Sequence, residues 1–157
     1  MFEQISAFFT IEMIYLWLSF GVIPFWFILI FFPQSKVCGL LATSIFPFLI
    51  LGSVYIYLVY YFFNTGYDFF ESFELYLGIY NLANLFENEA FLILIWTHFL
   101  AINLFCAAWI VRDSQKYFMP KYLNIMPLII TYFVGPVGIV IYWIIRIFFA
   151  KKISLFD

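Results

Sequence analysis

Four long runs of the sequence contain no Asp, Glu, Lys or Arg. They lie at about residues 13–32, 40–63, 90–111 and 123–145 of the 157-residue chain. Each run is near or above the roughly 20 residues that cross a ~30 Å hydrocarbon core as a helix. Lipid admits only structures whose backbone hydrogen bonds are satisfied internally, so the runs predict four transmembrane helices.

Composition argues against a soluble fold. Charged residues make up 10% of the chain and its mean hydropathy is +1.06, whereas about 25% of residues are charged in a typical soluble domain. A soluble fold cannot bury that much apolar surface in so short a chain. We therefore expect an all-α, polytopic membrane protein, with a four-helix bundle that forms one membrane domain over residues 1–157.

The two ends of the chain bear on processing and orientation. The stretch MFEQISAFFTIE before the first run has no basic segment and no small-residue cleavage pattern, so we expect a retained span rather than a signal peptide.

The orientation in the membrane is predicted from charge, because basic residues near span ends mark the cytoplasmic side. The first and third connections are basic and the second is acidic, whereas Arg146, Lys151 and Lys152 favour the opposite orientation. The sequence alone leaves the orientation open.

The connection between the second and third spans predicts a helix of its own. Over about residues 71–88, polar residues such as Glu71, Glu74 and Asn81 recur at helical spacing among aromatic and aliphatic ones. This pattern predicts an amphipathic helix in the membrane interface. Because its polar face is acidic, a lid over the bundle or a contact with another subunit is an equally good interpretation.

Three prolines, Pro24, Pro47 and Pro136, fall inside predicted spans. Each removes a backbone donor and crowds the carbonyl four residues earlier, so we expect three helices to be kinked or locally unwound. Transporters use such breaks to expose backbone groups to a substrate. Proline is also common in ordinary membrane helices, which is the interpretation we prefer.

Small residues form a stripe on the last span. Thr131, Gly135 and Gly138 recur along one face, and Tyr142 continues it. Such stripes let two helices approach closely, so we interpret this one as a packing surface.

The third span carries the only histidine of the chain, His98, and also Asn103. At about 100° per residue, the two side chains point about 140° apart, so each is expected to face a different neighbouring helix. Interhelical hydrogen bonds account for both. Intramembrane polar groups are nevertheless functional-site candidates by default. His98 stays open between the two interpretations, and for Asn103 we favour packing.

Several classes of site are excluded by residues that the spans lack. One histidine cannot supply a membrane di-iron oxygenase or a two-histidine haem, and the spans hold no lysine for a retinal Schiff base. A single axial ligand to a chlorophyll or haem stays open. No carboxylate lies at the depth of His98 for Ser-His-Asp catalysis. The two cysteines lack metal-ligand spacing, so we predict no metal site. Seven scattered Lys and Arg make no polybasic stripe for nucleic acid.

The second half of the chain has a recognisable order of residues. His98 is followed by Asn103-Leu104-Phe105, by Trp109 and by Arg112-Asp113, and the last span holds Gly135-Pro136-Val137-Gly138. This order resembles the abscisic-acid-deficient-four family of small integral membrane proteins. Pro24, Trp26 and Pro33 also fit its opening, so the resemblance covers most of the chain, although the second half is the specific part.

The resemblance implies a role linked to carotenoids. Plant members of the family are associated with neoxanthin synthesis, and bacterial relatives are numerous. For this chain the resemblance implies a carotenoid-associated, isomerase-like or carotenoid-binding protein with a bound carotenoid as candidate ligand. The expected location is a bacterial inner or photosynthetic membrane or a plastid membrane.

One position departs from the family pattern. Asn103 stands where the family usually has Asp, and an amide can neither protonate an epoxide nor take a proton from carbon. His98 and Asp113 are the candidate catalytic residues, but about 15 residues of helix separate them by roughly 22 Å, too far for one reacting centre. Either the chemistry differs or the protein binds rather than converts, so whether it is an enzyme stays open.

The candidate ligand-binding residues lie on the third and fourth predicted spans. We expect Arg112 and Asp113 to form an interfacial pair, and the glycines to give close backbone approach. The candidates are Trp96, Asn103, Trp109, Arg112, Gly135, Pro136, Gly138 and Tyr142.

Two other functions compete with the carotenoid-linked one. The first is a non-catalytic accessory subunit, or a pigment- or lipid-binding scaffold, of a larger photosynthetic or respiratory membrane complex. The second is a small transporter or channel, which only the three prolines support. Aromatic residues make up 26% of the chain and suit a polyene ligand, although rings fill any membrane core. The expected partners are membrane lipids, a carotenoid or other membrane subunits.

Overall fold

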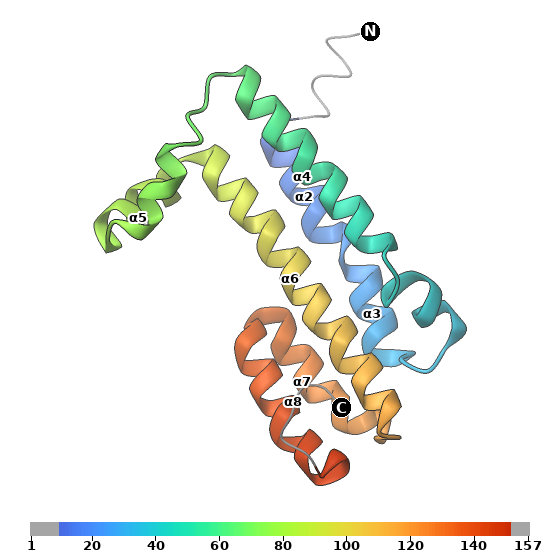
Figure 1. The fold of residues 1–157 in the computed structure, drawn as a ribbon. Coiled ribbons are helices and arrows are strands. Elements are labelled where there is room, and N and C mark those ends of the chain that lie inside the picture. The colour runs from blue at the N-terminus through green and yellow to red at the C-terminus, as the bar shows by residue number, and fades with distance from the viewer. Residues whose placement is uncertain (1–9, 152–157) are drawn as a thin grey trace, which may run out of the picture. The chain divides into compact units, whose positions relative to one another are not determined.

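The computed structural model describes residues 10–151. Over that range the chain has seven α-helices, two short helical segments of other types and no strand, so the all-α expectation is confirmed (Figure 1). The chain divides into two compact units, Met1–Gly21 with Phe48–Leu100, and Val22–Pro47 with Ala101–Asp157. The prediction of a retained first span rests partly on residues 1–9, which lie outside the described residues. Lys152, one of the basic residues used for the orientation, also lies outside them.

The first unit is built mainly from long apolar helices. It holds α2 (Ile11–Gly21), nearly all of α4 (Phe46–Asn64) and the first part of α6 (Glu89–Lys116). The α6 helix is uninterrupted for 28 residues. The side chain of Trp96 on α6 donates a hydrogen bond of 3.1 Å to the hydroxyl of Ser19 on α2, which ties these two helices together.

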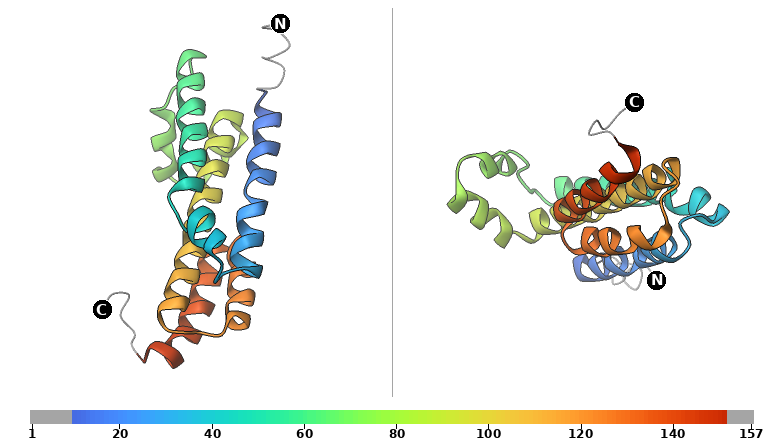
Figure 2. Two further views of the ribbon diagram at one scale, coloured as in Figure 1. Left: turned by 90° about the vertical axis from the view of Figure 1, so that its right-hand side faces the viewer. Right: turned by 90° about the horizontal axis from the view of Figure 1, so that it is seen from below.

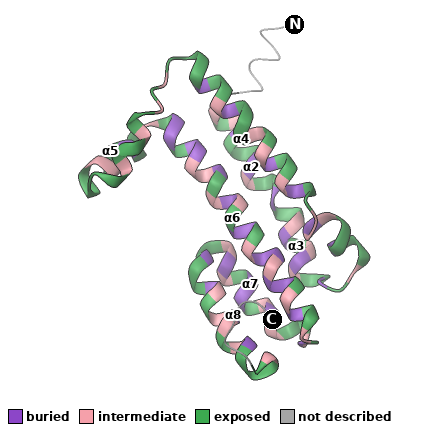
Figure 3. Cartoon of the chain, viewed as in Figure 1, coloured by how far each residue is buried: buried purple, intermediate pink, exposed green. Residues whose placement is uncertain are grey.

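The connection between α4 and α6 is helical in two pieces. The 3-10 segment η3 (Glu71–Tyr76) and the nine-residue helix α5 (Ile79–Glu87) pack against one another. They replace the single helix expected over residues 71–88, because Gly78 between them has a φ of 133°, a conformation that glycine adopts readily and other residues do not. Most of both pieces is exposed, as Figure 3 shows in green. Their place in a membrane interface stays a prediction.

The second unit contains three shorter helices packed around the end of α6. These are α3 (Ile23–Phe31), α7 (Lys121–Phe133) and α8 (Gly135–Ala150). The π-helical segment η2 (Cys38–Ala42) and α7 both pack against α3. The core of this unit is apolar and includes Trp26, Leu29, Leu104 and Leu128.

Each of the three prolines stands second in a helix. Pro24 follows Ile23 at the start of α3, Pro47 follows Phe46 at the start of α4, and Pro136 follows Gly135 at the start of α8. At that position the missing N–H interrupts no intrahelical hydrogen bond. The interruptions expected at these prolines are therefore present, in the form of new helix starts.

The fourth apolar run is not one helix. The span expected over residues 123–145 is divided at Val134, which has a non-helical φ of −140° and ψ of 78°. The helices on either side, α7 and α8, fold back and pack closely along their lengths as an antiparallel hairpin (Figures 1 and 2). Pro136 cannot donate to α7, and the glycines at positions 135 and 138 admit the close contact that a reversal needs.

Within residues 10–151, three helical stretches are long and apolar enough to cross a membrane. They are Ile11–Phe31, which includes the break at Pro24, then Cys38–Asn64 and Glu89–Lys116. The α8 helix is apolar but shorter. The expected count of four spans is therefore not confirmed, since three such stretches are followed by a helical hairpin.

Candidate functional site

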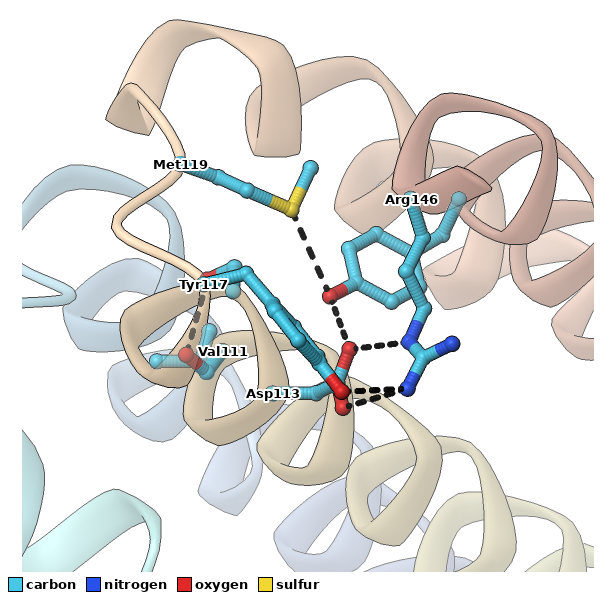
Figure 4. Close-up of polar contacts among 7 residues, drawn as sticks. Val111, Asp113, Tyr117, Met119 and Arg146 are labelled. Atoms are coloured by element: carbon cyan, nitrogen blue, oxygen red, sulfur yellow. Dashed lines mark hydrogen bonds and ion pairs between the residues drawn. The ribbon is translucent and has the colours of Figure 1, made fainter. Parts of the chain in front are cut away.

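Four side chains form a polar clamp at the end of α6 and on α8. They are Asp113, Tyr117, Tyr142 and Arg146. The guanidinium of Arg146 lies 2.7 Å (Nε) and 3.4 Å (Nη2) from the carboxylate oxygens Oδ2 and Oδ1 of Asp113. The hydroxyl of Tyr142 donates to Oδ2 of Asp113 at 2.6 Å, and Nη2 of Arg146 donates to the hydroxyl of Tyr117 at 3.2 Å. Figure 4 shows these contacts together.

The polar clamp is shielded from the surroundings. The side chains of Arg146 and Asp113 are 1% and 9% exposed, and Tyr142 is fully buried. An unpaired charge at such a place is very costly, so the arginine and the carboxylate neutralise one another. Charge-assisted hydrogen bonds of this kind are roughly twice as strong as neutral ones. The clamp therefore fastens α8 to α6.

Aromatic rings enclose the polar clamp. The Arg146 guanidinium lies 4.8 Å from the ring centre of Tyr117 and 5.3 Å from that of Trp143. Trp109 meets Tyr142 edge-on at 5.6 Å and stacks on Trp143 at 5.9 Å. Rings that face a cation add favourable electrostatic energy where water is excluded. Of the predicted site residues, the structure brings Asp113, Trp109 and Tyr142 together here.

A second cluster lies at the turn between α7 and α8, which we call the hairpin turn. A Cβ atom added at Gly135 would collide with the side-chain oxygen of Asn103 on α6. One added at Gly138 would collide with the hydroxyl of Thr131 and lie 2.7 Å from the carbonyl oxygen of Pro127, both on α7. The predicted small-residue stripe is therefore divided between two helices, and its glycines let α8 approach both α7 and α6.

Asn103 is buried at the hairpin turn with an unused donor. Its side-chain nitrogen Nδ2 has no hydrogen-bond partner among the described residues. The packing role expected for Asn103 is only half fulfilled, because a buried donor without an acceptor costs free energy.

A groove of about 660 Å³ runs between α2 and α6 in the first unit. Trp96 lines it together with Tyr15, whose ring centre is 5.6 Å from that of Trp96. Glu12 and Glu89, in the first turns of the two helices, also line it. Trp96 thus belongs to an apolar groove and not to the polar clamp.

Three predicted residues lie apart from these arrangements. His98 is exposed and has no hydrogen-bond partner among the described residues. Arg112 is also exposed, and Asp113 pairs with Arg146 and not with its sequence neighbour Arg112, which corrects the expected pairing. Pro136 is exposed at the start of α8, where its role is to break the backbone.

Sequence reasoning overlooked Arg146 and Tyr117. Arg146 was interpreted only as an orientation marker at the end of an apolar run. It lies four residues after Tyr142, so both side chains project from one helical face. An arginine that continues a buried face was the available signal for the clamp.

The polar clamp is stabilising rather than reactive as it stands. The proton of Tyr142 and the oxygens of Asp113 are already engaged, and neither group is open to a ligand. Among residues 10–151, no group of three His, Cys, Asp or Glu side chains lies together in a way that would hold a metal ion.

Fold and site together define a small α-helical protein with stretches fit to cross a membrane and a buried ion pair between its last helices. The model of the ABA DEFICIENT 4-like family matches residues 13–142. The chain belongs to this ABA4-like family, as the order of its site residues suggested.

A plant protein is among its relatives. Protein ABA DEFICIENT 4, chloroplastic, of Arabidopsis thaliana is 27% identical to this chain over 105 residues, which are 61% of this chain and 44% of the plant protein. The chain thus spans less than half the length of that curated relative. No solved structure matches the chain.

Proposed function

We propose that this chain is an integral membrane protein that binds a carotenoid. The observation that carries the proposal is the apolar groove between α2 and α6, lined by Tyr15 and Trp96. The family supplies the ligand class, because its plant members are associated with neoxanthin synthesis.

The groove has the volume of a ligand pocket and a mainly apolar lining. Its volume of about 660 Å³ falls inside the usual range of ligand pockets, roughly 300–1,000 Å³. Aromatic and aliphatic side chains line it, and Glu12 and Glu89 lie at the helix starts. An apolar chain would lie along the rings, and the two carboxylates would accept hydrogen bonds from a hydroxylated end group.

Binding is better supported than conversion. General acid–base catalysis needs a proton donor and acceptor within reach of one reacting atom. The polar clamp offers no such open pair, because its groups are already engaged, and His98 lacks a partner among the described residues. An isomerase remains the second candidate. It is favoured by the Tyr142 hydroxyl beside Asp113, which would supply an acid if the clamp opened.

The test is pigment bound to protein purified in mild detergent. We expect a carotenoid in the absorption spectrum and in mass analysis of the extract, and a loss of most of it in the Trp96→Leu variant. Phe20→Leu is the matched control, since Phe20 is an exposed ring on α2 outside the groove. Absence of carotenoid from the wild-type protein, with a reproducible set of partner chains, would replace the proposal with the accessory-subunit function.

The same proposal includes a membrane topology of three spans and a re-entrant hairpin. Lys121 begins α7 on the side of the membrane where α6 ends. Because the chain reverses at Val134 between α7 and α8, Lys151 returns to the same side. Lys36 follows the first crossing, and two further crossings lead from it to the end of α6, so Lys36 also lies on that side. All basic residues of the described chain then lie on one side of the membrane. Arg146 and Lys151 therefore no longer favour an orientation opposite to that of the first and third connections. Because basic residues near span ends mark the cytoplasmic side, this side is cytoplasmic or stromal.

Cysteine labelling tests this topology. In a background with both native cysteines replaced by Ala, we expect an impermeant maleimide to reach Lys36→Cys and Lys151→Cys from one side and Glu74→Cys from the other. Labelling of Lys151→Cys together with Glu74→Cys would restore a fourth complete span and contradict the hairpin.

A further inference from the structure

An apolar groove lies between α3 and α7 in the second unit, and we call it the α3–α7 groove. Its volume is about 320 Å³, and the side chains that line it are aliphatic or aromatic. They come from α3 between Ile23 and Phe31 and from the last turns of α7. Phe27 and Phe31 are more than half exposed, so the groove opens onto the surface of the protein. A membrane lipid can therefore enter it from the side.

The length of the α3–α7 groove matches one leaflet of a bilayer. The helix rises by about 12 Å from Ile23 to Phe31. Half of a ~30 Å hydrocarbon core is about 15 Å. The groove therefore has the length for one acyl chain of a lipid in a single leaflet, and it is too short for a molecule that crosses both leaflets.

The end of α3 and the start of α7 are neighbours. Trp26, near the start of α3, meets Tyr132, near the end of α7, with ring centres 5.1 Å apart. Pro33, just after α3, accepts a hydrogen bond of 2.5 Å from Gln115 near the end of α6, and α7 begins shortly after α6 at Lys121. The two helices that form the groove are therefore antiparallel, and one end of the groove lies at the end of the unit where α6 stops.

Two lysines stand at that end of the groove. Lys121 is the first residue of α7, and Lys36 lies in the connection that follows α3. Both are exposed, and neither has an ion-pair partner among residues 10–151. Residues 22–47 and 101–151 hold six Lys or Arg and one acidic residue, Asp113, which is already paired with Arg146. The charge of this unit therefore favours an anion from outside the chain.

We propose that the α3–α7 groove binds one acyl chain of an anionic phospholipid, and that Lys36 and Lys121 hold its phosphate. Lysine side chains near a span end reach to the level of the headgroups. Anionic lipids are found in the cytoplasmic leaflet, which is the leaflet that the proposed topology gives to these lysines. The inference rests on the membrane topology of the proposed function and not on its carotenoid.

The charges disfavour other occupants of the groove. A second copy of the chain seated by the same face would bring four lysines together, and no unpaired carboxylate is described in this unit to offset them. A zwitterionic lipid carries its own cation beside the phosphate, which opposes the approach of a lysine. An anionic lipid meets both lysines with a net negative charge.

The test uses phosphatidylglycerol and phosphatidylcholine that carry the same brominated acyl chains, because bromine quenches tryptophan fluorescence on contact. The protein is titrated with each lipid in maltoside micelles. Trp26 lines the groove, and its share of the quenching is the part that is lost in Trp26→Phe. We expect phosphatidylglycerol to quench Trp26 at a mole fraction about 25-fold lower than phosphatidylcholine does, about fivefold for each lysine.

Lysine variants make the result specific. Lys36→Gln combined with Lys121→Gln should lower the affinity for phosphatidylglycerol to that for phosphatidylcholine and leave the latter unchanged. Lys151→Gln is the matched control, since it removes the same charge from an exposed lysine at the end of α8, and it should keep the preference. If Trp26→Phe does not fold, native mass spectrometry of the wild-type protein decides, with one retained phosphatidylglycerol and no retained phosphatidylcholine expected.

The outcomes separate this inference from the proposed function. Equal quenching by the two lipids, no quenching that depends on Trp26, or a preference that survives the loss of both lysines overturns the inference. None of these results touches carotenoid binding at Trp96, which pigment analysis of Trp96→Leu tests alone. A protein that is dimeric in micelles and shields Trp26 from both lipids assigns the groove to a second copy and also overturns the inference.

Discussion

The two ends of α8 are held against α6 in opposite ways. At the polar clamp, Arg146 and Tyr142 satisfy the carboxylate of Asp113 with charge-assisted hydrogen bonds. At the hairpin turn, Gly135 packs on Asn103 with no room for a side chain, and the amide nitrogen finds no acceptor among residues 10–151. A buried polar group that the protein fully satisfies stabilises the fold, whereas one left unsatisfied costs free energy.

The largest effect is expected when one charge of the clamp is removed. Arg146→Met leaves Asp113 buried without its cation, which should lower the free energy of unfolding by about 3–5 kcal/mol. The measurement is unfolding of the purified protein in mixed micelles. Arg112→Met is the matched control, since Arg112 directly precedes Asp113 in the sequence and is exposed. It should change the free energy of unfolding by no more than about 0.5 kcal/mol.

A double variant sharpens the comparison. Replacing the whole pair, as in Asp113→Leu with Arg146→Met, removes both charges and should recover most of the loss caused by Arg146→Met alone. A double variant as unstable as the sum of the two single variants would show that the ion pair is not the source of the stability.

The next effect is expected at the hairpin turn. In Gly138→Ala the new methyl group meets the backbone of both Pro127 and Thr131, so the helices must move apart, at a cost of about 3 kcal/mol. The matched control is Gly52→Ala on α4, where a Cβ meets nothing within 4 Å. That control should be neutral or gain about 0.5–1 kcal/mol from helix propensity. Equal effects at the two glycines would mean that α7 and α8 do not pack as a hairpin.

A smaller effect is expected when only the hydroxyl of the clamp is removed. Tyr142→Phe deletes the 2.6 Å hydrogen bond to Asp113 and keeps the ring that packs on Trp109. The loss should be about 2 kcal/mol, as for a hydrogen bond to a charged partner. Tyr132→Phe, on a half-buried ring of α7 for which no hydroxyl contact is seen, is the control and should change little.

The composition of the chain predicted its secondary structure well but not its turning points. Apolar runs identify helices because lipid demands internal hydrogen bonding. A run of about 23 apolar residues has the same composition whether it crosses the membrane as one helix or folds back as two half-length helices. Both arrangements place apolar side chains in an apolar environment. Only Gly135-Pro136 marked the difference, and we interpreted Pro136 as a kink and Gly135 as part of a packing surface.

The candidate site could be predicted only in part for a related reason. Trp109, Asp113 and Tyr142 were identified as candidates, but the partner of Asp113 lies 33 residues away on another helix. Helical periodicity orders residues along one helix and gives no information on which helices touch. His98 illustrates another case, since its rarity in the sequence suggested a role, and that role stays a prediction because the side chain is exposed and contacts no partner among the described residues.

The smallest effect, of opposite sign, is expected at Asn103. Asn103→Leu replaces the amide by an apolar group of similar size, so the unsatisfied donor disappears and the protein should become about 1 kcal/mol more stable. At the clamp, by contrast, every removal of a polar group destabilises. The same unfolding assay in micelles measures both. Asn124→Leu is a parallel case, since Oδ1 of the buried Asn124 also has no hydrogen-bond partner among the described residues. A loss of 2 kcal/mol or more in Asn103→Leu would mean that its amide is satisfied in the membrane protein, and the two ends of α8 would then be held by the same kind of contact.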